Sequence, residues 1–179
     1  MTITDSQRTS IGAKTGLTAD LGGAAPLLGS DADLTPAQAA DVARLEAMLE
    51  VAFLAAAADG EITDPEADNL GATLASWLGG ELSDDAVEAV IERFMAALAA
   101  DGRAARLAAA AARLDADARM SAYTLACVVT LCDLELDDAE LDALGEIATA
   151  LDLAQADAQR RFEEVQDHVE AVVANARRS

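Results

Sequence analysis

The chain has 179 residues, of which 53% are hydrophobic and only 3% aromatic, and its formal net charge at pH 7 is −21. Such an acidic surface repels nucleic acids and anionic membranes, which argues against both as partners and favours cations or basic proteins. No apolar run approaches the roughly 20 residues of a membrane span, and the N-terminus shows no signal-peptide pattern, so we expect a cytoplasmic protein without direct membrane insertion.

Residues 1–33 hold five of the eleven glycines and show no sustained hydrophobic period. This composition predicts a flexible N-terminal tail. The acids and bases of residues 1–30 cancel, so the whole negative charge falls in the rest of the chain. Four leucines of the tail also fit a short docking peptide for another protein: Leu17, Leu21, Leu27 and Leu28.

Residues 34–179 show the period of amphipathic helices and are expected to form the folded domain. Thr35 and Pro36 form a helix-start signature, because a hydroxyl caps free backbone N–H groups and proline is tolerated at the first helical position. The expected helices cover about 36–58, 64–78, 84–100, 103–115, 117–132, 138–151 and 155–176. Helices joined by short loops, without a credible strand, predict an all-α fold, a compact bundle.

Several apolar side chains are expected to build the core of this bundle. The first long helix carries one continuous apolar stripe and should therefore pack on one face. Trp77 and Tyr123, the single Trp and Tyr of the chain, are expected to anchor the core. Cys127 and Cys132 point about 140° apart on one helix and cannot form a local disulfide, so buried reduced thiols are expected.

An acidic pattern occurs twice, each time at a corner between two expected helices. Residues 59–66 read Asp-Gly-Glu-Ile-Thr-Asp-Pro-Glu and residues 133–140 read Asp-Leu-Glu-Leu-Asp-Asp-Ala-Glu, so both copies follow Asp-x-Glu-apolar-x-Asp-x-Glu. Each copy ends in the first turn of a helix, where the later acids fit capping boxes and the positive end of the helix dipole. The break at Asp101 and Gly102 carries arginines at the corresponding positions and is expected to be a plain turn.

Capping does not explain the first two acids of each copy. Crowded carboxylates repel one another unless water, a basic group or a cation relieves them. Oxygen ligands without His or Cys suit Ca²⁺ or Mg²⁺ better than zinc or copper. Neither copy has the glycine and glutamate positions of an EF-hand loop, so a cation site would pool both corners. Three interpretations stay open: a cation site, helix caps with surface charge, and a contact with a basic protein.

The motif strings resemble those of the tellurite-resistance TerB family. The resemblance rests on Ala56-Ala57-Ala58-Asp59-Gly60-Glu61-Ile62 with Glu66, and on the repeat from Asp133 to Leu141, and it covers about residues 40–170. It implies an all-helical domain with a pseudo-twofold repeat, divalent-cation binding and a place in membrane-associated stress-response complexes. It also implies that six acids act together: Asp59, Glu61, Glu66, Asp133, Glu135 and Glu140.

The leading hypothesis is a non-enzymatic TerB-like protein that binds a divalent cation and thereby biases contact with a protein partner. The alternative is a metal-independent scaffold or cargo adaptor that docks through the N-terminal tail or the acidic surface. Assembly into a homo-oligomer is compatible with either. A hydrolase built on paired carboxylates would need a cleft between the corners. His168 is the only histidine and lies among acids, which disfavours a catalytic triad or a di-iron site.

Overall fold

The computed structural model describes residues 4–16, 24–28, 33–58, 62, 64–78, 84–132 and 138–176. Two short elements come first, α1 (Asp5–Thr15) and the 3-10 turn η1 (Ala25–Leu27). The longer helices are α3 (Pro36–Ala56), α4 (Asp64–Trp77), α5 (Asp84–Asp101), α6 (Arg103–Ala111), α7 (Ala116–Cys132), α8 (Asp138–Ala150) and α9 (Gln155–Ala176). These ranges contain no strand, so the all-α prediction is confirmed. Each helix predicted after residue 35 is present, with ends within a few residues of the prediction.

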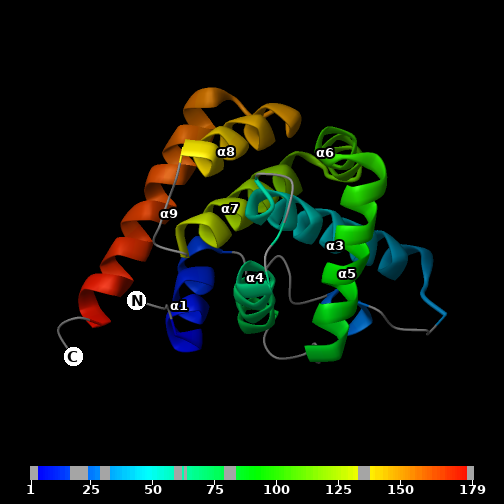
Figure 1. Cartoon of the computed structure of the whole chain (residues 1–179), viewed down its shortest axis with the longest axis horizontal. Helices are drawn as coiled ribbons and strands as arrows, with labels where there is room; N and C mark the ends of the chain where they lie inside the picture. Colours follow the sequence, from blue (N-terminus) through cyan, green and yellow to red (C-terminus); the bar gives the residue numbers. More distant parts are fainter. Residues whose placement is uncertain are drawn as a thin grey trace.

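The bundle is built around α3 and α7, which pack against each other more extensively than any other described pair of helices. In Figure 1, α8 and α9 lie on one side of this pair and α5 and α6 lie on the other. Residues 47–55 of α3 and 122–132 of α7 are buried around their whole circumference. The single buried stripe predicted for α3 is therefore too narrow, because its alanines let neighbouring helices approach on several sides.

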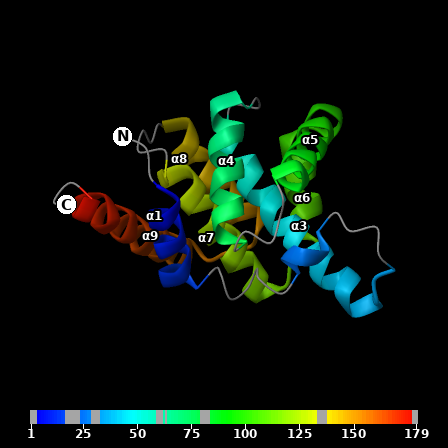
Figure 2. The same ribbon diagram turned by 90° about the horizontal axis from the view of Figure 1, so that it is seen from below.

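The start of α3 confirms the predicted helix-start signature. The Thr35 hydroxyl accepts a hydrogen bond from the Gln38 backbone N–H at 3.3 Å, and the Gln38 side chain accepts one from the Thr35 N–H at 3.0 Å. This reciprocal pair is a capping box, and Pro36 occupies the first helical position. The first turns of α3 are exposed and extend away from the other helices in Figure 2.

The N-terminal segment differs from the flexible tail that its composition predicts. Residues 5–15 form α1, which packs against α4 and α9 (Figures 1 and 2). Ile11 is fully buried, and the indole N–H of Trp77 on α4 donates a hydrogen bond to the Arg8 carbonyl oxygen at 3.0 Å. Because α1 carries a single large apolar residue, its sequence shows no periodic stripe. Contacts with the other helices stabilise it instead.

Two of the four leucines of the predicted docking peptide, Leu27 and Leu28, lie in the part of the chain that the structure describes. Leu28 is buried in the core of this chain, and Leu27 beside it is half-buried. These two side chains are therefore engaged internally rather than presented to a partner. Leu17 and Leu21 lie outside the described residues, so their part of the hypothesis stays a prediction.

The predicted core anchors are confirmed. Trp77 and Tyr123 are 1% and 4% exposed, and Cys127 and Cys132 are buried free thiols. No helix within the described ranges combines the length and the apolar content needed to cross a membrane.

Candidate functional site

The two acidic patterns lie at comparable corners of the bundle. The first occupies the connection from α3 to α4, and the second occupies the connection from α7 to α8. Since α3 and α7 are the central pair, each copy follows the end of one central helix. The prediction of two helix-loop-helix corners is therefore confirmed at the level of the helices.

The structure describes only part of the predicted ligand set. Glu140 is half-buried in α8, and Glu66 is the third residue of α4, where only its backbone is described. The other four predicted ligands lie outside the described residues: Asp59, Glu61, Asp133 and Glu135. Among the residues that are described, no group of three or more His, Cys, Asp or Glu is placed to hold a metal. The pooled cation site therefore stays a prediction.

The later acids of each copy begin helices, as the sequence predicts. Asp138 and Glu140 lie in the first turn of α8, and Asp64 is the first residue of α4. A carboxylate in this position is stabilised by the partial positive charge of the helix N-terminus. Asp138 and Glu140 therefore have a local structural role whether or not a cation binds.

Arg103 connects the end of α3 with α8. Its Nε donates a hydrogen bond to the Leu54 carbonyl oxygen at 3.2 Å, and its guanidinium pairs with Glu146 of α8. The end of α3 that leads into the first corner thus lies beside the helix that begins at the second corner. The predicted turn before Arg103 is confirmed, because Gly102 has a φ of 79°, a conformation that glycine adopts at low cost. The link made by Arg103 was not foreseen from the sequence.

Sequence reasoning also missed a buried carboxylate on the central helix α3. Glu50 of α3 is 1% exposed and accepts hydrogen bonds from Nε of Arg106 at 2.7 Å and from Nη2 of Arg113 at 2.5 Å. The hydrogen bond with Glu50 raises the pKa of Arg106, and the Asp101 carboxylate on α5 adds to this effect. The available signal was one acid inside the apolar run that surrounds Glu50. The arrangement fixes α6 and the turn after it onto α3.

Two further titratable side chains, Cys127 and Tyr123, are buried in α7. Burial raises the pKa of the Cys127 thiol to about 12, so this group stays protonated near neutral pH and is a poor nucleophile. Burial likewise raises the pKa of Tyr123. His168 lies half-buried on α9, with Nδ1 2.6 Å from the Glu164 carbonyl oxygen of the same helix.

Comparison with known families tests the resemblance seen in the motif strings. The family described as tellurite resistance protein TerB matches residues 45–162, which contain both acidic corners. The chain belongs to the TerB family. The TerB match begins within α3 and ends within α9, so α1 and η1 lie outside it. Comparisons with curated proteins and with solved structures gave no match.

Proposed function

We propose that this TerB protein is a non-enzymatic, cytoplasmic binder of divalent cations that acts in a stress-response context of the kind the family description indicates. Ca²⁺ or Mg²⁺ would be held by the acids of both corners: Asp59, Glu61, Glu66, Asp133, Glu135 and Glu140. The observation that carries the proposal is the repetition of one acidic pattern after each of the two central helices.

The chemistry of the donor set fits these cations. Carboxylate oxygens are hard ligands, and Ca²⁺ takes about six to eight of them in flexible geometries. A site shared by the two corners would draw its carboxylates from two helix connections, so neither short loop would have to wrap around the cation by itself. The contacts of Arg103 with Leu54 and with Glu146 support this arrangement, because they hold the end of α3 close to α8. A bound cation would neutralise the crowded carboxylates and order the two corners relative to each other.

Calorimetric titration with Ca²⁺ and Mg²⁺ tests the proposal. We expect binding by the wild-type chain, and we expect Glu61→Gln combined with Glu135→Gln to weaken it by at least about tenfold. A carboxylate that touches the metal matters more than a group that only hydrogen-bonds to a ligand, and loss of the latter already weakens metal binding by about 10- to 100-fold. The matched control is Glu163→Gln combined with Glu170→Gln, which removes the same charge from exposed positions of α9. At a pooled site, either single corner variant should weaken the one binding event that is observed. At independent sites, each single variant should instead weaken one of two binding events and leave the other unchanged.

Two results would overturn the cation proposal. One is the absence of binding to the wild-type chain at millimolar metal. The other is equal weakening by the corner variant and by the α9 control, because that would show attraction of cations by net charge alone.

The second candidate is a metal-independent scaffold or cargo adaptor. The observation in its favour is an acidic groove between α4 and α5, whereas the packing of α1 against the bundle disfavours residues 5–15 as a free docking segment. A partner that is captured equally well with and without a chelator would support this candidate. Loss of capture on chelation would instead support a role for the cation.

A further inference from the structure

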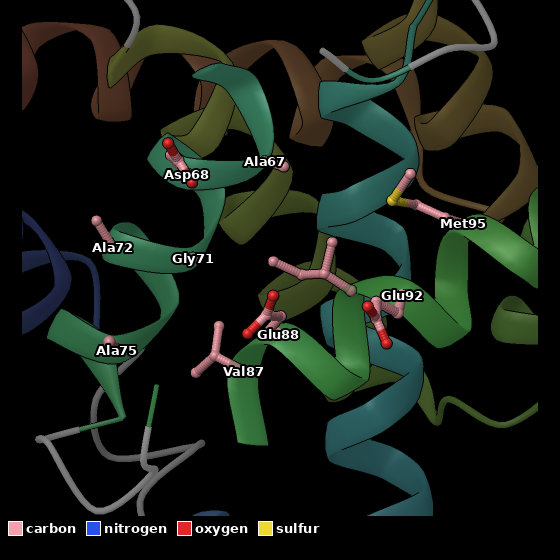
Figure 3. Close-up of a pocket in the computed structure, with 10 residues that line it drawn as sticks. Ala67, Asp68, Gly71, Ala72, Ala75, Val87, Glu88, Glu92 and Met95 are labelled. Carbon is pink, nitrogen blue, oxygen red and sulfur yellow. The ribbon is translucent and has the colours of Figure 1, made fainter. Parts of the chain in front are cut away.

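A groove of about 620 Å³ lies between α4 and α5 (Figure 3). On α4 its lining begins at Ala67, the residue after Glu66 of the first acidic corner. Its floor is apolar and includes Gly71 of α4 with Val87 and Ile91 of α5. A Cβ atom at Gly71 would lie 3.5 Å from the nearest Val87 carbon and 3.7 Å from the nearest Ile91 carbon. The two helices therefore approach closely at the floor, while the groove remains open above it.

The apolar surface continues to Met95, which closes one end of the groove. Val87, Ile91 and Met95 are spaced four residues apart, so they lie along one side of α5. Met95 is nevertheless 43% exposed, and Leu141 is the other large hydrophobic side chain that is exposed in the described part of the chain. The apolar stripe of α5 is therefore wider than the surface that the neighbouring helices cover.

The rim of the groove is acidic. Asp68 of α4 and Glu88 and Glu92 of α5, labelled in Figure 3, line the groove, and all three side chains are exposed. No basic side chain of the described residues forms an ion pair with these three acids. Arg93 follows Glu92 directly but pairs with Glu46 of α3 at 2.8 Å. The groove therefore has an apolar floor and a negatively charged rim whose charges are not balanced by these ion pairs.

We propose that this groove binds an amphipathic helix of a partner protein, with an apolar stripe facing Val87, Ile91 and Met95 and with Lys or Arg side chains facing the rim. Apolar anchors at helical spacing are the usual way in which a helix occupies a hydrophobic groove. The charge of the rim selects a basic partner and disfavours both an anionic membrane and a second copy of a chain with a net charge of −21. This proposal goes beyond cation binding and does not depend on it.

The test is a titration of the full chain with a fluorescent model peptide of about five helical turns. The peptide carries Leu at helical spacing and Lys on both flanks, and a second peptide of the same composition has its stripe scrambled. We expect the striped peptide to bind more tightly, and we expect Glu88→Lys combined with Glu92→Lys to weaken it by at least about tenfold. Met95→Ser should weaken it by about threefold or more, because the floor loses apolar contact area.

Matched controls separate the groove from the general charge of the surface. Glu163→Lys combined with Asp167→Lys makes the same charge change at the same spacing on exposed positions of α9. Leu141→Ser removes an apolar side chain that is 44% exposed, which matches Met95 closely. Both controls should leave the affinity for the striped peptide within about twofold of wild type, since neither position lines the groove.

Several outcomes would overturn the proposal. Equal binding of both peptides, or equal weakening by the α9 control, would show that the peptide is attracted by the net charge of the chain and not by the groove. A dimer in sedimentation velocity that Met95→Ser dissociates would assign the groove to a second copy of the chain. Anionic vesicles that bind the wild-type chain but not Met95→Ser would assign it to a membrane. Because the titration is done in chelator, failure of the cation proposal leaves its result unchanged.

Discussion

Replacing Glu50 by Gln tests how much the buried carboxylate contributes to the fold. Its oxygens accept charge-assisted hydrogen bonds from Nε of Arg106 at 2.7 Å and from Nη2 of Arg113 at 2.5 Å, and Nη2 of Arg106 forms an ion pair with it at 2.6 Å. At about 1.5 to 3 kcal/mol for each hydrogen bond to a charged group, the gross contribution of the two bonds is roughly 3 to 6 kcal/mol. The side chains of Arg106 and Arg113 are 24% and 34% exposed, so water replaces part of what they lose. We therefore expect a net loss of about 2 to 3 kcal/mol in the free energy of unfolding.

Urea and thermal unfolding followed by circular dichroism measure this loss. For a chain of this size the expected fall in the melting temperature is about 4 to 12 °C. The control is Glu46→Gln, one helical turn earlier on α3, whose ion pair with the 54% exposed Arg93 should contribute less than about 1 kcal/mol. A double-mutant cycle with Arg106→Gln should show coupling between Glu50 and Arg106. If Glu50→Gln and Glu46→Gln unfold at the same urea concentration, the assignment of stability to the buried ion pairs is wrong.

Three further predictions follow from the described contacts. Ile11→Ser should shift the fluorescence of Trp77 to longer wavelength and increase its quenching by acrylamide, because α1 covers the indole; a flexible tail would leave both unchanged. Between about pH 9 and 12 the unfolded chain loses the Cys127 proton while the native chain keeps it. The free energy of unfolding should therefore fall as pH rises, by up to about 1.4 kcal/mol per pH unit, and Cys127→Ala should make this fall less steep. Thr35→Ala should cost about 1 kcal/mol in urea unfolding, and Thr35→Ser should restore most of it.

Local signals were sufficient to predict most of the helices. A cap such as Thr35 and a stripe such as the one on α5 act within one helix, so they are visible in the sequence. The sequence did not predict α1, because this helix contributes only Ile11 of its described side chains to the hydrophobic core and is stabilised by contacts with α4 and α9. A helix stabilised mainly by distant contacts leaves little pattern in its own residues.

The electrostatic features depend on distant residues and were therefore harder to predict. Glu50 finds its partners 56 and 63 residues further along the chain, at positions that no local spacing connects. The periodicity of α5 correctly placed Met95 on the apolar stripe, but the position of α4 decides that this edge of the stripe stays exposed. For the acidic corners, the pattern predicts helix starts at Asp64 and Asp138, which are confirmed, whereas pooling of the carboxylates depends on how the corners meet.

The distribution of ion pairs determines how the two proposed sites influence each other. Every arginine described between residues 33 and 176 pairs with a carboxylate, and none of these pairs involves the groove rim. A cation at the corners repels the basic side chains of a bound helix through space, and this repulsion extends only over the screening length. The screening length is about 10 Å at 0.1 M salt and about 3 Å at 1 M. The affinity for the striped peptide should therefore differ little between Ca²⁺ and chelator at 1 M salt. A difference that persists at 1 M salt would contradict independent sites and would indicate that the corners and the α4–α5 groove share a conformational change.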